Sequence, residues 1–277
     1  MYSFYCGKYV LDLRYPLVMG IVNVTPDSFS DGGKYVSTDQ AVEHAMHLIA
    51  EGADILDIGG ESTRPGATPV SLQEELDRVL PVIEKLSRVS DVPLSIDTYK
   101  PEVMRAAILA GVDIVNDIRA LQEPGALEIV AQSNVGVCLM HMQGHPQTMQ
   151  INPQYNDVVL EVKSFLSVRM AAAEKAGIEK NRIVLDPGFG FGKRTLHNIA
   201  LLKDLQSLTE LGRPLLVGLS RKSVLGQIMG ADSVYERQYA SLSASVIAVM
   251  NGARIVRVHD VKATADALKV VSAVLSD

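Results

Sequence analysis

Short apolar runs alternate with longer amphipathic segments along almost the whole chain, and this alternation restricts the fold more than any other feature. Each run is nearly continuous in hydrophobic residues, as is typical of strands buried on both faces of a parallel sheet. We predict eight such strands, at residues 18–24, 55–59, 93–98, 113–118, 136–142, 182–186, 214–220 and 254–258. Strands that alternate with helices favour a parallel α/β architecture.

Eight strand–helix units favour a closed barrel over an open doubly wound sheet. A (β/α)₈ barrel needs roughly 250 residues, and the chain has 277. No linker rich in Ser, Pro or Gly divides the sequence. We therefore predict an α/β fold, a single-domain (β/α)₈ TIM barrel over residues 1–277.

Local signals predict where several helices begin and end. Two sequences have the form of a capping box, Ser37–Gln40 ahead of a helix over 41–50 and Ser71–Glu74 ahead of one over 76–86. Pro101 suits the first turn of another helix, and Gly111 ends it.

Composition excludes several classes of protein. The formal net charge of −6 provides no basic surface for nucleic acid. No apolar run reaches the roughly 18 residues of a membrane span, and the N-terminus has no signal-peptide pattern. The two cysteines form no C-x-x-C pair, and Cys138 lies in an apolar run, which favours a reducing compartment. We predict a cytoplasmic protein that binds neither membrane nor nucleic acid.

Polar residues follow each predicted strand. They are Asn23, 61–65, Asp97, Asn116, Asp117, His141, Asp186, 220–222 and 257–260. In a barrel of parallel strands the carboxyl ends form one face, and the loops there carry the chemistry. A single polar residue at a strand end is explained at least as well by its closeness to solvent as by a function. Closeness to solvent explains the whole set less well, so we predict an active site at this face.

Asp97, Asn116 and Asp186 form the first group of candidate ligand-binding residues. They should be partly buried, and buried polar groups need partners. The edge of an amino-pyrimidinone ring would suit them, because a carboxylate accepts two parallel N–H bonds. The alternative is a pair of structural salt bridges to Lys222 and Arg221, which leaves Asn116 without a purpose.

A second group is cationic and contains Arg64, Arg221, Lys222, Arg257 and His259. Such a cluster suits a phosphate or diphosphate, and residues two apart on a strand project to the same side. Asn23 could supply an oxygen ligand to Mg²⁺, which often binds through few protein groups plus substrate phosphates. Arg257 and His259 could instead pair with Asp260 or with the opposite strand.

The segment from Asp186 to Lys193 is rich in glycine but matches neither common nucleotide-binding pattern. Pro187 replaces the first Gly of a P-loop, and Lys193 replaces the last Gly of a dinucleotide loop. We interpret its glycines as positions where backbone bends or approaches a ligand closely. The residues alone suggest no role for Lys193.

Seven motifs in this order resemble those of the bacterial dihydropteroate synthases, which are pterin-binding enzymes. They start at Asn23, Gly59, Ser95, Asn116, Asp186, Ser220 and Arg257. The resemblance implies a homodimeric (β/α)₈ barrel. It also implies an Mg²⁺-assisted transferase of folate synthesis, which joins 6-hydroxymethyl-7,8-dihydropterin diphosphate to 4-aminobenzoate.

The resemblance also assigns roles to individual residues. The pterin would contact Asp97, Asn116, Asp186 and Lys222. The diphosphate would contact Asn23, Thr63, Arg64, Arg257 and His259, with Asn23 as the metal ligand. Phe29, Thr63, Pro65, Phe191, Lys222 and Ser223 would form the aminobenzoate site, where sulfonamides also bind in this family. Lys222, Arg257 and Asp97 are the expected catalytic residues.

The leaving group and the nucleophile together favour dissociative substitution, since an aryl amine needs no strong base. We expect residues 25–34 and 62–69 to be mobile loops that close over the site. One rival hypothesis is a methyltetrahydrofolate methyltransferase, which would need a corrinoid partner. The other is a non-catalytic pterin-binding homologue, which should lack Asn23, Arg64, Lys222 or Arg257.

Overall fold

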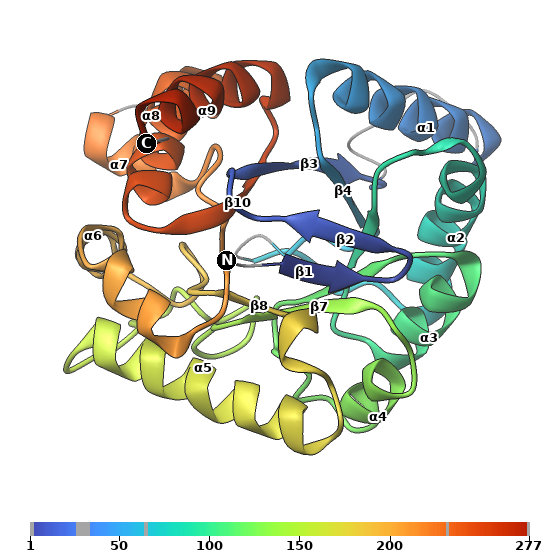
Figure 1. Ribbon diagram of the computed structural model, residues 1–277, viewed down its shortest axis with the longest axis horizontal. Coiled ribbons are helices and arrows are strands. Elements are labelled where there is room, and N and C mark those ends of the chain that lie inside the picture. The colour runs from blue at the N-terminus through green and yellow to red at the C-terminus, as the bar shows by residue number, and fades with distance from the viewer. Residues whose placement is uncertain (1–2, 26–33, 64–65, 231–232, 276–277) are drawn as a thin grey trace.

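Eight parallel strands close into a barrel in the computed structural model, which describes residues 3–25, 34–63, 66–230 and 233–275 (Figure 1). The strands are β3 Leu17–Asn23, β4 Ile55–Gly59, β5 Leu94–Asp97, β6 Ile114–Asp117, β7 Gly136–Met140, β8 Ile183–Asp186, β9 Leu215–Val217 and β10 Ala253–Val258. They pair in chain order, and β10 pairs with both β3 and β9 to close the ring. The predicted barrel is confirmed.

Helices surround the barrel, as Figure 1 shows. They are α1 Lys34–Glu51, α2 Leu72–Val89, α3 Pro101–Ala110, α4 Ala126–Ala131, α5 Val158–Lys175, α6 Thr195–Lys203, α7 Ser223–Met229, α8 Gln238–Met250 and α9 Val261–Leu275. Three 3₁₀ segments lie at Lys180–Arg182, Leu205–Leu211 and Tyr235–Arg237. Within the described ranges, no helix combines the length and apolar character that a membrane crossing requires.

The helix-boundary predictions have mixed outcomes. Ser71 caps α2, because its Oγ accepts a hydrogen bond from the Glu74 backbone N–H at 3.2 Å. Pro101 opens α3, and Gly111 ends it with a φ of 109°. The prediction from Ser37 was wrong, since α1 already begins at Lys34. The capping pattern Ser37–Gln40 lies inside α1 and does not mark the start of the helix.

An antiparallel hairpin, β1 Ser3–Cys6 and β2 Tyr9–Asp12, covers the amino-terminal opening of the barrel and was not predicted. Phe4 and Cys6 are buried against residues from the lower half of the barrel interior. These are Met19, Ile55, Ile114, Cys138, Val184, Leu216 and Ile255. Gly136 leaves room for the Phe4 ring, since a Cβ at Gly136 would lie 2.4 Å from it. The hairpin lies across the front of Figure 1.

The barrel interior therefore divides into two parts. Its lower half is an apolar core filled from below by the hairpin, and a second apolar core lies between strands and helices. The buried polar residues of the upper half include Asp57, Ser95, Asp97, Asn116 and Asp186. The fold thus places buried polar atoms at the carboxyl ends of the strands.

Candidate active site

Alternation along each strand decides which side chains enter the upper barrel. In β4, Ile55 belongs to the lower core, while Leu56 and Ile58 pack outward against the helices. Successive side chains of a strand point to opposite faces, so Asp57 points inward. The same pattern turns Asp97 inward from β5 and Arg257 inward from β10.

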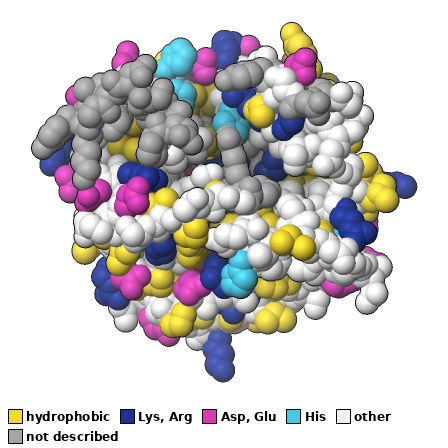
Figure 2. All heavy atoms as spheres, turned by 180° about the vertical axis from the view of Figure 1, so that it is seen from behind, with side chains coloured by type: hydrophobic (Ala, Val, Ile, Leu, Met, Phe, Trp, Pro, Cys, Tyr) yellow, Lys and Arg dark blue, Asp and Glu magenta, His cyan; other side chains and the backbone are white. Residues whose placement is uncertain are grey.

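Strand register brings the predicted residues to one level. Asp97 lies opposite Gly59 in β4 and opposite Asn116 in β6, and Gly59 lies opposite Asn23 in β3. These four positions lie at or next to the ends of adjacent strands, as the sequence predicted. Figure 2, turned by 180° from Figure 1, shows the molecule from this side, with Lys and Arg side chains near the centre of the view. Phe29, Arg64 and Pro65 lie outside the described residues.

Arg257 joins two carboxylates in the centre of the site. Its Nε donates to Asp57 Oδ2 at 2.5 Å, and a second guanidinium nitrogen donates to Asp97 Oδ2 at 2.8 Å. Asn116 Nδ2 also donates to Asp57 Oδ2, at 3.1 Å. Asp57 was not predicted, yet it touches two of the predicted residues. Its signal was a charged residue at an inward position of an apolar strand.

These contacts decide between the alternatives raised for Asp97 and Arg257. Asp97 does pair internally, but with Arg257 and not with Lys222 or Arg221. Arg221 instead binds Asp260, with nitrogen–oxygen distances of 2.6 and 3.1 Å. Arg257 does not pair with Asp260 but reaches across the barrel to Asp57 in β4 and Asp97 in β5, so the alternative of pairing with an opposite strand is confirmed.

Several acceptor atoms of the site have no partner among the described residues. They are Asp57 Oδ1, Asp97 Oδ1 and Ser95 Oγ, all of them buried. Burial raises the pKa of Asp97, although Arg257 opposes this change. Burial also lowers the pKa of Arg257, but Asp57 and Asp97 more than reverse this and hold it above its ordinary value. The site therefore holds a permanent cation beside carboxylate oxygens that lack donors.

Asp186 and Lys222 form the other side of the site. Asp186 accepts a hydrogen bond from the Gly188 N–H at 2.7 Å, and burial raises its pKa while Lys222 opposes this. Burial lowers the pKa of Lys222 to about 8, against the attraction of Asp186. The Lys222 ammonium donates to the Phe189 carbonyl and lies 4.5 Å from the centroid of the Phe191 ring.

The glycine-rich loop after β8 is held through its carbonyl groups. Each carbonyl from Gly188 to Lys193 accepts a hydrogen bond from a side chain; the donors, in order, belong to Lys193, Lys222, Gln150, Lys193, Tyr155 and Asn198. Glycine is required at two points of this loop. A Cβ at Gly188 would lie 1.9 Å from the His141 carbonyl, and one at Gly192 would lie 2.4 Å from the Gln143 carbonyl.

Lys193, which the sequence left without a role, is buried beneath this loop. Its ammonium donates to the carbonyls of Gly188 at 2.8 Å and Phe191 at 3.0 Å, and lies 2.8 Å from His141 Nδ1. Burial lowers the pKa of both Lys193 and His141. Lys193 therefore fixes the backbone on either side of Phe189 and sets the position of Phe191.

The remaining predicted residues lie around the edge of the site. His259 directly follows β10, and its Nδ1 lies 3.0 Å from Ser220 Oγ. Ser223 is the first residue of α7 and lines an open cavity together with Gly190. Thr63 follows the end of β4 by four positions. Within the described ranges, no group of three or more His, Cys, Asp or Glu side chains could hold a metal ion.

The comparisons with known proteins agree with this geometry. The family described as "Pterin binding enzyme" matches residues 19–259. The dihydropteroate synthase of Escherichia coli (strain K12) is 54% identical over 266 residues, covering 96% of this chain and 94% of that protein. The chain belongs to the dihydropteroate synthase family.

Solved structures of this dihydropteroate synthase family share the fold. The Xanthomonas albilineans enzyme with 4-aminobenzoic acid superposes with a TM-score of 0.94 at 53% identity, covering 99% of this chain and 98% of that one. The same enzyme in complex with 7,8-dihydropteroate gives a TM-score of 0.91 at 50% identity, covering 99% of each chain.

Proposed function

We propose that this chain is a dihydropteroate synthase of folate synthesis. It would join 6-hydroxymethyl-7,8-dihydropterin diphosphate to 4-aminobenzoate and release pyrophosphate. The observation that carries the proposal is the group of buried acceptor oxygens around Asp97, Asn116 and Asp186, next to the cations Lys222 and Arg257. Its support from relatives is the product 7,8-dihydropteroate bound by the Xanthomonas albilineans enzyme.

The pterin ring would bind deepest, among Asp97, Asn116, Asp186 and Lys222. The unpaired Oδ1 of Asp97 would accept from ring N–H groups, because a buried acceptor without a donor is costly. Asp186, already oriented by the Gly188 N–H, would accept from the amino-pyrimidinone edge. Arg257 favours the ionised form of Asp97 for this role by direct contact.

The diphosphate would lie nearer the mouth, in contact with Asn23, Thr63, Arg64, Arg257 and His259. Mg²⁺ fits this arrangement, because it commonly binds through one or two protein oxygens plus substrate phosphates. Asn23 supplies such an oxygen at the end of β3. When bound, Mg²⁺ would neutralise charge on the diphosphate oxygens.

The aminobenzoate would bind in front of the pterin, between Phe29, Thr63 and Pro65 on one side and Phe191, Lys222 and Ser223 on the other. Phe191 is half-buried, with the Lys222 ammonium close to its ring. The glycine-rich loop fixes this ring through its paired carbonyls. A sulfonamide would compete for the same space because its aryl amine has the same shape.

Substitution would proceed dissociatively. The bond between the pterin methylene carbon and the diphosphate oxygen breaks first, and its electron pair leaves with the diphosphate. The aminobenzoate nitrogen then forms the new C–N bond with its lone pair and loses a proton to solvent. Arg257 and Lys222 would stabilise the departing charge, and Asp97 the pterin cation, as preorganised electrostatic groups.

The decisive assay measures pyrophosphate release from pterin diphosphate with Mg²⁺ and 4-aminobenzoate. We expect release that requires the aminobenzoate and is inhibited competitively by a sulfonamide. Release without aminobenzoate, or none, would refute the proposal. Asp186→Ala should abolish pterin binding while the circular dichroism spectrum stays that of the parent protein.

We also propose that two copies associate through the outer faces of α6, α7 and α8. Large apolar side chains are exposed there, including Leu196 at 76%, Ile228 at 56% and Tyr239 at 80%. Contiguous exposed apolar surface marks an interaction site. Sedimentation should give a dimer, and Tyr239→Glu should give monomers.

We further propose that the protein works in the reducing cytoplasm. Both cysteines are buried and form no disulfide, which suits such a compartment.

A further inference from the structure

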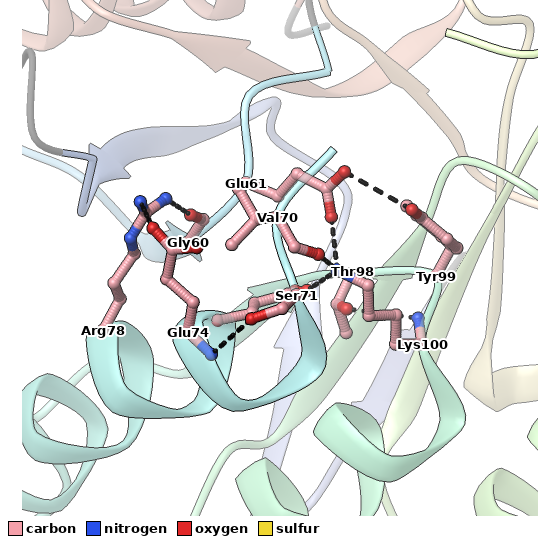
Figure 3. Close-up of polar contacts among 10 residues, drawn as sticks. Gly60, Glu61, Val70, Ser71, Glu74, Arg78, Thr98, Tyr99 and Lys100 are labelled. Atoms are coloured by element: carbon pink, nitrogen blue, oxygen red, sulfur yellow. Dashed lines mark hydrogen bonds and ion pairs between the residues drawn. The ribbon is translucent and has the colours of Figure 1, made fainter. Parts of the chain in front are cut away.

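Lys100 connects the two ends of the segment that leaves β4 and enters α2. Its ammonium donates to Glu61 Oε2 at 2.5 Å, at the start of this segment, and to the Val70 carbonyl at 2.7 Å, at its end. The third contact is Glu75 Oε2 in α2, at 2.6 Å. An ammonium has three N–H donors, and all three are used. Figure 3 shows Lys100 facing both ends.

Neighbouring groups hold the same two ends. Tyr99 donates to Glu61 Oε1 at 3.3 Å, and Arg78 in α2 donates to the Gly60 carbonyl at 2.7 Å (Figure 3). Glu61 and Lys100 are both largely buried, with side-chain exposures of 9% and 16%. The two ends of the segment 61–70 are therefore anchored, just outside the predicted mobile loop 62–69.

This anchor is placed where it affects the proposed chemistry. Lys100 follows Asp97 by three residues, and Asp97 pairs in register with Gly59, just before Glu61. Thr63 lies two residues beyond Glu61, inside the anchored segment. A loop whose ends are fixed samples far fewer positions than one with free ends. The contacts of Lys100 thus limit where Thr63 can lie relative to Asp97.

We propose that Lys100 is a positioning residue for the aminobenzoate: by holding Glu61 and the Val70 carbonyl together, it sets the distance between Thr63 and the pterin site. This inference rests on the proposed function. The simpler alternative is that Lys100 only neutralises Glu75, which is 1% exposed and has its Oε1 unpaired among the described residues. The two explanations differ in which carboxylate matters for catalysis.

The test separates the two carboxylates by mutation. Glu61→Ala removes the loop side of the contact and should raise the KM for 4-aminobenzoate on the order of tenfold, since small displacements of positioning groups cost that much or more. Binding of 6-hydroxymethylpterin, which lacks the diphosphate, should stay within twofold. Glu75→Gln leaves the loop contact intact and should leave this KM unchanged. The matched control is Glu174→Ala in α5, which removes the 2.7 Å contact of Glu174 with Arg213.

A double-mutant cycle completes the experiment. Lys100→Met is made in the Glu75→Gln background, so that the most deeply buried partner of Lys100 is not left as an unpaired carboxylate. Lys100→Met should raise the KM for 4-aminobenzoate as Glu61→Ala does. Combining the two changes should add little, because both break the same contact between Lys100 and Glu61. An unchanged KM in an active protein would overturn the inference, as would equal losses of aminobenzoate and pterin binding. If the unmutated protein releases no pyrophosphate, the proposed function fails instead.

Discussion

At the scale of single residues, the site is a group of buried charges whose pKa values are displaced by their neighbours. Asp97 and Asp186 have raised pKa values, and Arg257 has a raised one as well. Two groups of the site titrate near neutral pH: burial lowers the pKa of Lys222 to about 8, and burial raises the pKa of Asp97 to about 7. The protonation of Lys222 and of Asp97 therefore sets the charge of the pterin site under ordinary conditions.

Lys222 should give the enzyme a descending pH limb. Below its pKa of about 8 the side chain is an ammonium ion, and above it the side chain is neutral. We expect kcat/KM for pterin diphosphate to fall about tenfold per pH unit above this value, since kcat/KM reports the free enzyme. In Lys222→Arg the residual activity should lack this limb, because a guanidinium does not titrate there. The same limb in both proteins would contradict the assignment.

Asp57 should matter as much as the residues that it holds. It is fully buried and accepts from both Arg257 and Asn116. Asp57→Asn should lower kcat/KM for pterin diphosphate about 100-fold, equivalent to ~2.7 kcal/mol of transition-state stabilisation. The control is Asp54→Asn, which alters a contact to the Val18 N–H at the other end of the barrel. Equal losses in the two variants would show that Asp57 is only structural.

At the scale of elements, the loop after β8 shows that many glycines need not mean a loose loop. The backbone carbonyls of a short surface loop commonly accept hydrogen bonds from water, but in this loop side chains supply the donors. The glycines allow close contact with the His141 and Gln143 backbone. The buried ammonium of Lys193 binds the loop carbonyls of Gly188 and Phe191 and lies against His141. The aromatic wall is therefore preformed.

Lys193→Met tests this view of the loop. Methionine has similar length but leaves the Gly188 and Phe191 carbonyls without their donor, which should lower the free energy of unfolding by about 1–3 kcal/mol. Because Phe191 then loses its fixed position, the KM for 4-aminobenzoate should also rise several-fold. Urea unfolding and steady-state kinetics measure the two effects. Lys203→Met, on the exposed surface of α6, should change neither.

At the scale of the whole molecule, stability and chemistry lie at opposite ends of the barrel. The lower interior is apolar and closed by the β1–β2 hairpin, whereas the upper interior holds the buried charges. Conservative changes at the lower end should therefore affect folding without affecting the reaction.

Phe4→Ala should show this separation. Phe4 is 1% exposed within the lower core, and truncating a buried Phe typically costs about 3–5 kcal/mol. We expect a loss of this size in urea unfolding, with KM and kcat within twofold of the parent protein. Tyr5→Ala, on the same strand with 43% exposure, should be nearly neutral. A large change in KM for Phe4→Ala would show that the two ends are coupled.

The sequence predicted the features that depend on local pattern. The strand runs and the polar residues at their ends gave the barrel and brought Asp97, Asn116 and Asp186 to one face. It missed Asp57, which looks like part of an apolar strand until Arg257 is seen to reach it from β10. Lys100 and Lys193 were missed for the same reason, since their partners are brought together only by the closed fold. The hairpin was missed because each strand has only four residues.

The hairpin has one more consequence, for the order in which the molecule assembles. It precedes every barrel strand along the chain, yet it rests on Leu216 and Ile255, from the last two strands. Such distant contacts form slowly because much chain must be ordered first. We therefore expect the hairpin to complete its contacts only after the ring has closed. Mutations in contacts that form this late speed unfolding and leave the folding rate nearly unchanged.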